Sequence, residues 1–255
     1  MPAANKPQSA HRLPYSANWA LFLDIDGTLL EMAETPGKVV VTAQVRTLVH
    51  NLDRALSGAC ALISGRTLSD VDALFRIPRL SAAGLHGMEY RLDGNSTTYV
   101  QTVDESVMAG FRRKLSAYMD RHPGLLLEDK KFSLAVHFRQ APALQADVEK
   151  IVQAAIAGYD ADFHIQNGKM LAEIKSRNAD KGRVILYFMD QPRFHGRIPV
   201  FIGDDVTDED GFRAVNHRGG ISIKVGDGES DADWTLEQPG DVIAWLEDYL
   251  KFLLT

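Results

Sequence analysis

The sequence has almost no cysteine and no surplus of basic residues. Cys60 is the only cysteine in 255 residues, so no internal disulfide can form. Lys and Arg together number 28 against 34 Asp and Glu, and the net charge is −6. A protein with this balance has no basic excess to neutralise a nucleic-acid backbone. We therefore expect no disulfide framework and no nucleic acid as a main partner.

Long hydrophobic runs and internal repeats are absent as well. No segment approaches the ~20 apolar residues that a membrane helix needs. The first eighteen residues mix polar, basic and proline residues, without the apolar stretch of a signal peptide. We expect a flexible N-terminal tail over residues 1–11, no membrane partner and a cytoplasmic location.

What is present is typical of a globular protein. Hydrophobic residues make up 45% of the chain and charged residues 24%, which is enough apolar material for a real core. A length of 255 residues suits two modest domains. The acidic balance leaves a small anionic substrate open, because a local cluster of Lys and Arg can bind one.

Both ends of the chain alternate strand and helix patterns. The apolar runs at 19–23, 59–63 and 200–203 are typical of strands buried on both faces of a parallel sheet. Residues 42–56 have apolar side chains at helical spacing behind Thr42, a good N-cap. This alternation predicts an α/β fold with a doubly wound parallel sheet. The predicted core comprises residues 12–103 and 177–255.

The middle of the chain has a different order of elements. It is expected to contain two helices, 104–121 and 142–158, and four strands, 125–128, 132–138, 161–166 and 169–174. Asn167-Gly168, between the last two strands, is a strong signal for a hairpin turn. Hairpins mixed with helices predict a small α+β unit, residues 104–176, that is inserted into the larger sheet as a cap.

Two carboxylates end the first predicted strand, in Leu23-Asp24-Ile25-Asp26-Gly27-Thr28-Leu29-Leu30. Open α/β sheets bind ligands at this edge. Two such close charges favour a bound cation, and hard oxygen ligands select Mg²⁺. The Asp24 carboxylate can then attack phosphorus, Asp26 can protonate a leaving alkoxide and activate water, and the Thr28 hydroxyl can contact phosphate. The structural alternative is a strand end with two solvated acids.

Three more residues follow strands or open helices of the predicted core. The hydroxyl of Ser64 can donate to phosphate, although Ser-Gly is also ordinary turn chemistry. Asp204 can add a carboxylate to the metal, with Asp205 and Asp208 behind it, although the same acids suit a helix start. Lys181 can neutralise Asp24 and phosphate, although a solvated lysine is the simpler interpretation.

The four segments around Asp24, Ser64, Lys181 and Asp204, in this order along the chain, resemble the haloacid dehalogenase (HAD) superfamily of phosphatases. The inserted unit resembles the larger α/β cap of that superfamily. Within that superfamily the sequence is similar to the trehalose-6-phosphate phosphatase family. The similarity spans almost the whole chain after the tail and rests on six segments: Asp24-Ile25-Asp26-Gly27-Thr28-Leu29, Ile63-Ser64-Gly65-Arg66, Gly84-Leu85-His86-Gly87-Met88-Glu89, Ala135-Val136-His137-Phe138-Arg139, Glu173-Ile174-Lys175 and Gly203-Asp204-Asp205-Val206-Thr207-Asp208-Glu209.

The resemblance implies an Mg²⁺-dependent phosphatase that releases phosphate from trehalose 6-phosphate through an aspartyl phosphate. It implies that Asp24 is the nucleophile and Asp26 the general acid/base, and that Ser64 and Lys181 hold phosphate. The implied ligands of Mg²⁺ are Asp24, the Asp26 carbonyl and Asp204. The partner is a small sugar phosphate, and a functional link to a trehalose-6-phosphate synthase follows from the same resemblance.

The resemblance also implies that the cap binds the sugar through paired acidic and basic residues: Glu128, Lys130, Glu173 and Lys175. Charged hydrogen bonds to sugar hydroxyls are stronger than neutral ones. The structural alternative is cross-strand ion pairing within the cap sheet.

Three loop residues at the edge of the core sheet, Arg66, His86 and Glu89, are predicted to line the same substrate cleft. The sequence departs from the family at one position: Ser176 follows Lys175, where family members often have proline. This departure concerns the path of the local loop and leaves the role of Lys181 unchanged.

Three competing functions fit parts of the same pattern. A related capped phosphatase would act on sucrose phosphate or a mannosyl phosphate, and only the short cap segments oppose it. A non-catalytic sugar-phosphate-binding protein on this fold is opposed by the presence of both Asp24 and Asp26. A phosphomutase would also form an aspartyl phosphate but would release little free phosphate.

Overall fold

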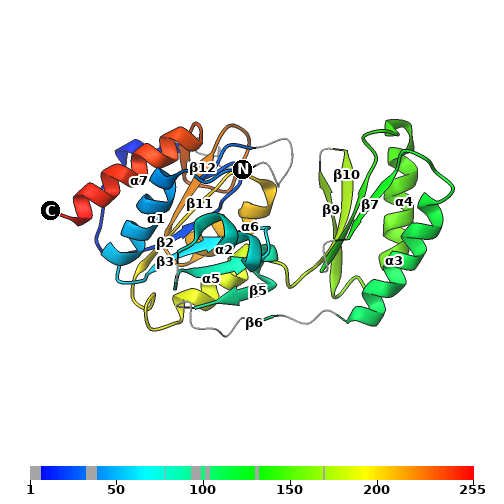
Figure 1. The fold of residues 1–255 in the computed structure, drawn as a ribbon, viewed down its shortest axis with the longest axis horizontal. Helices are drawn as coiled ribbons and strands as arrows, with labels where there is room; N and C mark the ends of the chain where they lie inside the picture. The colour runs from blue at the N-terminus through cyan, green and yellow to red at the C-terminus, as the bar shows by residue number, and fades with distance from the viewer. Residues whose placement is uncertain are drawn as a thin grey trace, which may run out of the picture. The chain divides into compact units, whose positions relative to one another are not determined.

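The computed structural model describes residues 7–32, 39–77, 79–92, 99–100, 104–129, 132–168 and 170–255. The chain divides into two compact units (Figure 1). The first, here the core unit, comprises Met1–Val100 and Asp180–Thr255. The second, here the inserted unit, comprises Gln101–Ala179. None of the helices in these described ranges is both long and apolar enough to cross a membrane.

The core unit is built on a nine-stranded sheet within the described residues. Its strands lie in the order β1 (Gln8–Ser9), β13 (Trp234–Leu236), β12 (Ile221–Val225), β11 (Ile198–Gly203), β2 (Trp19–Leu23), β3 (Cys60–Ile63), β4 (Ser81–Gly84), β5 (Glu89–Arg91) and β6 (Tyr99–Val100). The strands from β1 to β4 are parallel, whereas β5 and β6 continue the sheet antiparallel. Every residue of β2 and β3 is buried, as expected for strands covered on both faces.

Helices cover this sheet in the pattern that the sequence predicts. They are α1 (Ala43–Ala55), α2 (Leu68–Phe75), α5 (Lys181–Met189), α6 (Glu209–His217) and α7 (Pro239–Leu253), with 3-10 turns η1 (Ala10–Arg12), η3 (Leu85–Gly87) and η5 (Val206–Asp208). Helix α1 packs beside α7, and α5 packs beside α6 (Figure 1). The predicted N-cap is confirmed, because Thr42 Oγ1 accepts the Val45 N–H at 3.3 Å. The doubly wound α/β core is thereby confirmed.

The strand order positions the site. The chain runs from β2 outward to β3 and β4 on one side, and later enters β11 on the other side of β2. Right-handed crossovers in opposite directions place their helices on opposite faces of the sheet. The order therefore reverses between β2 and β11, and open α/β sheets bind ligands beyond the carboxyl ends of the strands at such a point.

The start of the described chain adds to the core sheet. Strand β1 pairs with β13, and the Trp245 indole N–H donates to the carbonyl of the buried Ala10 at 3.0 Å. Part of the segment that the sequence assigns to a flexible tail is thus held in this sheet, whereas residues 1–6 lie outside the described residues. The sequence analysis also missed β5, β6 and β13, which are only two or three residues long.

The inserted unit is an antiparallel sheet packed on two helices. The strand order is β7 (Leu126–Asp129), β8 (Ser133–His137), β10 (Leu171–Ser176) and β9 (Phe163–Gly168), and the helices are α3 (Glu105–Met119) and α4 (Gln145–Ile156), with η4 (Pro142–Leu144) before α4. Leu134, Val136 and Ile174 belong to its hydrophobic core with Phe111. Alternation along β10 places Glu173 and Lys175 on the other face of the sheet.

The predicted hairpin between the last two strands is confirmed, but the predicted position of its turn at Asn167-Gly168 is wrong. Both residues belong to β9, where Asn167 pairs with Ala172 and Gly168 with Leu171, and the chain reverses beyond them. Met170 has a left-handed φ of +65° there. The observed register places Ile165 opposite Ile174, beside the apolar core of the unit. Cross-strand packing therefore prevails over the local turn signal.

Candidate active site

Strands β2 and β11 bring two of the predicted carboxylates together. Leu23 lies opposite Ile202, and the Asp24 N–H donates to the Ile202 carbonyl at 3.0 Å. Asp24 follows β2 and Asp204 follows β11, so both leave the sheet at the same edge. Gly27, with φ +83°, passes so close to the Asp204 carboxylate that a side chain on Gly27 would overlap it. This glycine lets the loop after β2 close over the site.

Three carboxylates form an acidic cluster at this edge. Oxygen atoms of Asp24, Asp204 and Asp208 all lie within 4.8 Å of one another. Asp208 is fully engaged: Oδ1 accepts from Lys181 at 2.6 Å, and Oδ2 accepts the N–H groups of Asp204 at 3.0 Å and Asp205 at 2.9 Å. Asp24 and Asp204 therefore remain as the side chains that fit a divalent cation. Such hard oxygen donors suit an ion of the Mg²⁺ class.

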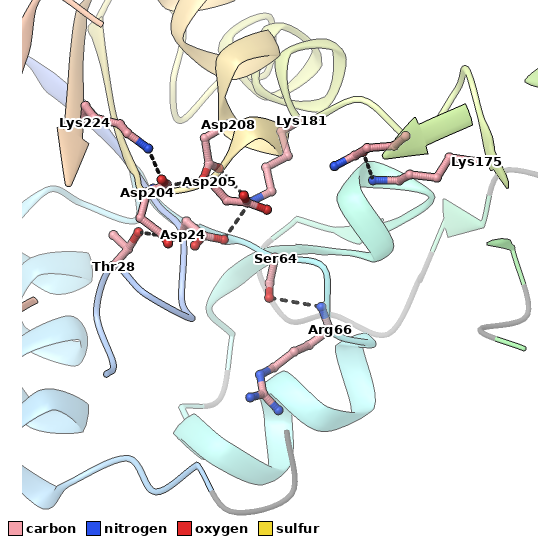
Figure 2. A network of polar contacts seen from close by, with 11 residues as sticks. Asp24, Thr28, Ser64, Arg66, Lys175, Lys181, Asp204, Asp205, Asp208 and Lys224 are labelled. Atoms are coloured by element: carbon pink, nitrogen blue, oxygen red, sulfur yellow. Dashed lines mark hydrogen bonds and ion pairs between the residues drawn. The ribbon is translucent and has the colours of Figure 1, made fainter. Parts of the chain in front are cut away.

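Lys181 lies between two of these carboxylates (Figure 2). Its Nζ donates to Asp24 Oδ1 at 2.7 Å and to Asp208 Oδ1 at 2.6 Å, and the side chain is 2% exposed. Lys181 begins α5, and the Asp180 carboxylate caps that helix by accepting the Arg183 N–H at 3.1 Å. The ammonium group of Lys181 is fully buried between two carboxylates. Lys181 is therefore not the solvated surface residue of the simpler interpretation.

The electrostatics of the cluster follow from its burial. Burial raises the pKa of Asp24 well above its ordinary value; the charge of Lys181 opposes this and that of Asp208 adds to it. Burial and the charge of Asp208 raise the pKa of Asp204 to about 6. Burial alone would lower the pKa of Lys181, but the charges of Asp208 and Asp24 outweigh it and raise that pKa. The raised carboxyl pKa values mean that ionisation of these buried acids is costly, and a bound cation would offset that cost.

Two predicted phosphate-binding hydroxyls lie beside this cluster. Ser64 is buried directly after β3, and its Oγ accepts the Arg66 N–H at 3.1 Å, so its own hydrogen is available to donate. Thr28 Oγ1 donates to Asp204 Oδ1 at 3.1 Å and thereby orients that carboxylate. Phosphate contacts for both residues stay predictions.

The three residues that were expected to line the cleft from loops make defined contacts, but His86 lies in η3 and Glu89 begins β5. Arg66 forms a two-point ion pair with Asp26, with Nε 2.6 Å from Oδ2 and Nη2 2.6 Å from Oδ1. The His86 N–H donates to the Ser64 carbonyl at 2.9 Å. Glu89 Oε1 accepts the Leu68 N–H at 2.5 Å, at the first residue of α2. Their predicted contact with substrate stays untested.

The inserted unit presents its predicted sugar-binding residues on one sheet face. Ser133 Oγ donates to Glu173 Oε1 at 2.6 Å, and Lys175 Nζ donates to Gln166 Oε1 at 3.1 Å. Glu128 Oε2 lies 2.9 Å from His137 Nε2. Glu173 and Lys175 are both buried. The fourth predicted residue, Lys130, lies outside the described residues.

Sequence analysis missed two features of the core site. Lys224 is buried, and its Nζ donates to the Asp204 carbonyl. Lys224 lies in the strand Ile221–Val225, whose other residues are Ile, Val and Ser. A lysine in such a strand indicates that its ammonium group must meet hydrogen-bond acceptors. Asp208 was expected behind the metal ligands or as a cap, and the cap is confirmed, because Asp208 and Asp205 form a capping box at η5. The contact that was not predicted is the one between Asp208 and Lys181.

Comparisons with known proteins agree on one family. The trehalose-phosphatase family model matches residues 22–239. The trehalose-6-phosphate phosphatase of Escherichia coli (strain K12) is 40% identical over 232 residues, which cover 91% of this chain and 86% of that protein.

Similar folds occur in solved structures. The C-terminal domain of C. albicans trehalose-6-phosphate phosphatase has a TM-score of 0.78 at 20% identity, over 92% of this chain and 93% of that one. A haloacid dehalogenase-like hydrolase from Bacteroides thetaiotaomicron has a TM-score of 0.62 at 12% identity, over 89% and 98% of the two chains. The protein therefore belongs to the trehalose-phosphatase family and has the HAD-like fold.

Proposed function

We propose that this protein hydrolyses trehalose 6-phosphate to trehalose and phosphate through a phosphorylated Asp24. The observation that carries this proposal is the buried Lys181–Asp24 pair at the carboxyl edge of the sheet. Lys181 fixes the rotamer of Asp24 and keeps a positive charge where a phosphate must approach. The trehalose-phosphatase family membership supports the choice of substrate.

The first step transfers the phosphoryl group to the protein. An oxygen of the Asp24 carboxylate attacks phosphorus, and the bond from phosphorus to the sugar oxygen breaks. The electron pair of that bond goes to the sugar oxygen, which takes a proton from Asp26 and leaves as trehalose. Ser64 and Lys181 donate to the phosphoryl oxygens, whose charge grows in the transition state.

The second step hydrolyses the aspartyl phosphate and restores the Asp24 carboxylate. Water attacks phosphorus while Asp26 takes one of its protons, and the bond from phosphorus to the Asp24 oxygen breaks. Inorganic phosphate leaves, Asp24 is again a carboxylate, and Asp26 again holds the proton that it lost in the first step. The exchange thus consumes one water and needs no other reactant.

We assign Asp24, Asp204 and the Asp26 carbonyl as the residues that would hold Mg²⁺. The acidic cluster and the raised pKa of Asp204, which arises from burial and from Asp208, support a divalent cation there. When bound, the ion would screen the charge of the phosphate from the Asp24 carboxylate.

We further propose that the inserted unit is the cap that selects the sugar. Glu128, Glu173 and Lys175 lie on one face of its sheet and offer acceptors and a donor for hydroxyl groups. Lys130 is predicted to join them. The domain bounds 104–176, a cytoplasmic location and a link to a trehalose-6-phosphate synthase remain predictions from the sequence.

A phosphate-release assay tests this function. Trehalose 6-phosphate, sucrose 6-phosphate and glucose 6-phosphate are compared, each with Mg²⁺ and with EDTA. We expect Mg²⁺-dependent release from trehalose 6-phosphate above the other two. Preferred release from another sugar phosphate would contradict the role of the cap, and release from none would contradict the hydrolytic function.

A further inference from the structure

We infer that Arg66 is a positioning residue that fixes the rotamer of Asp26, rather than a contact for the sugar. The inference rests on the proposed function, in which Asp26 is the general acid/base. It assigns to Arg66 a task that neither its sequence position nor the family membership defines. The argument comes from the contacts of the two side chains and from the loop that carries Arg66.

The contact between the two side chains is a two-point one. Arg66 Nε lies 2.6 Å from Asp26 Oδ2, and Arg66 Nη2 lies 2.6 Å from Asp26 Oδ1. The side chains are 12% and 31% exposed, so the pair is only partly screened by water. Parallel hydrogen bonds from a planar guanidinium fix a carboxylate in orientation as well as in distance.

The backbone of Arg66 is fixed as firmly as its side chain. Its N–H donates to Ser64 Oγ at 3.1 Å, and its carbonyl accepts the Leu85 N–H at 2.9 Å. Gly84 packs against the same carbonyl, at a place where a side chain would collide with it. Arg66 therefore connects the short loop that carries the predicted phosphate donor, Ser64, to the general acid/base, Asp26, which follows β2.

Asp26 is held apart from the acidic cluster. The cluster consists of Asp24, Asp204 and Asp208, whereas both oxygens of Asp26 accept from Arg66. Figure 2 shows the Arg66 side chain extending away from Asp24 and Lys181. Without Arg66, the Asp26 carboxylate would be free to turn to other rotamers.

This geometry predicts how the loss of Arg66 affects catalysis. A positioned general acid contributes about 100- to 10,000-fold to the rate. Misplacing it forfeits part of that factor, and we expect Arg66→Gln to lower kcat for trehalose 6-phosphate by about 10- to 100-fold. With p-nitrophenyl phosphate the leaving phenolate needs little protonation, so the single-turnover rate of the first step should fall there by less than about threefold.

The test measures kcat, KM and the single-turnover rate of leaving-group release for both substrates in Arg66→Gln, Arg66→Lys and Asp26→Asn, and in the double variant Arg66→Gln/Asp26→Asn. Arg91→Lys is the matched control, because Arg91 forms a two-point pair with Asp72 in the same unit, between β5 and α2. Circular dichroism and thermal melting of each variant confirm that it is folded. If Arg66→Gln does not fold, Arg66→Lys carries the comparison, because it keeps the charge but loses the two-point contact.

We expect Arg66→Gln to slow the first step far more with trehalose 6-phosphate than with p-nitrophenyl phosphate, and to add little to Asp26→Asn. A fall in kcat for both substrates is also expected, because Asp26 activates water in the second step that they share. Equal losses in the first-step rate on both substrates, a change confined to KM, or losses that multiply in the double variant would overturn the inference while the parent enzyme remains active. If the parent releases phosphate from neither substrate, the proposed function fails and this inference fails with it.

Discussion

The core unit and the inserted unit both bury charged side chains, but they stabilise them in different ways. In the core, Lys181 lies between two buried carboxylates, and the surrounding backbone is fixed by the registers of β2 and β11. In the inserted unit, the contacts of Glu173 and Lys175 include the neutral side chains of Ser133 and Gln166.

This difference in contacts corresponds to two tasks, which are holding a nucleophile and binding a sugar. An attacking carboxylate must not move, and opposite charges in a low-dielectric site fix it strongly. A sugar has many neutral hydroxyls, and hydrogen bonds to neutral side chains can be exchanged for hydrogen bonds to a ligand at small cost. We therefore expect substitutions in the core site to lower kcat or stability, and substitutions in the inserted unit to raise KM.

The largest expected effect comes from Asp24. Asp24→Asn removes the attacking oxygen anion, and we expect kcat for trehalose 6-phosphate to fall by at least about 10,000-fold. The fold should persist, because the variant replaces a buried carboxyl group whose pKa is raised by burial with a neutral amide. Steady-state kinetics and thermal melting measure the two quantities. Normal turnover in Asp24→Asn would remove the nucleophile assignment.

The second effect concerns stability. Lys181→Met leaves Asp24 and Asp208 buried without their shared cation, and breaking a buried ion pair costs about 3–5 kcal/mol of unfolding free energy. Urea unfolding without added metal measures this cost. Lys251→Met is the control, because Lys251 pairs with Asp248 on the surface and should change little. Equal stability of the two variants would mean that the buried pair does not stabilise the core.

The third effect should appear in KM. Glu173→Gln and Lys175→Met each remove a charged hydrogen-bonding group from the polar face of the inserted sheet. We expect KM for trehalose 6-phosphate to rise by about 10- to 100-fold, as for the loss of a charged hydrogen bond. KM for p-nitrophenyl phosphate should not change. Glu149→Gln, on the exposed side of α4, is the control and should leave both KM values unchanged. A rise in KM for both substrates would contradict a sugar-specific role.

The smallest effect is a pH dependence of stability. The folded-state pKa of Asp204 is about 6, against an ordinary value of 3.8, because of burial and Asp208. A raised carboxyl pKa costs stability at pH values above it, and this cost disappears as the pH falls from about 6 towards 3.8. The metal-free protein should therefore lose less stability on acidification than Asp204→Asn does. Parallel stability curves for the two proteins between these pH values would contradict this assignment.

Sequence patterns predicted what depends on local order. The buried run at 19–23 identified β2, and Thr42 identified the start of α1. The spacing of Asp24 and Asp26 after a strand predicted a site at the carboxyl edge of the sheet, and the structure brings Asp24 and Asp204 together there. These features follow from hydrophobic period and capping, which act within a few residues.

Sequence patterns did not predict the features that depend on contacts between distant segments. The register of β9 against β10 depends on packing of Ile165 and Ile174, which the Asn-Gly turn signal does not include. The pairing of Arg66 with Asp26 joins residues 40 positions apart. Lys224 and Asp208 meet their partners only when β11, β12 and α5 assemble.

The central claim is that Asp24 carries the phosphoryl group during turnover. The direct measurement mixes the Asp26→Asn variant with p-nitrophenyl phosphate and Mg²⁺, quenches with acid and maps phosphorylation by peptide mass spectrometry. The p-nitrophenolate leaves without a proton from Asp26, whereas hydrolysis of the intermediate is slowed, so we expect a phosphoryl group on Asp24 that hydroxylamine removes. A protein that turns over trehalose 6-phosphate but carries no phosphoryl group on Asp24, or carries it on another residue, would contradict the account.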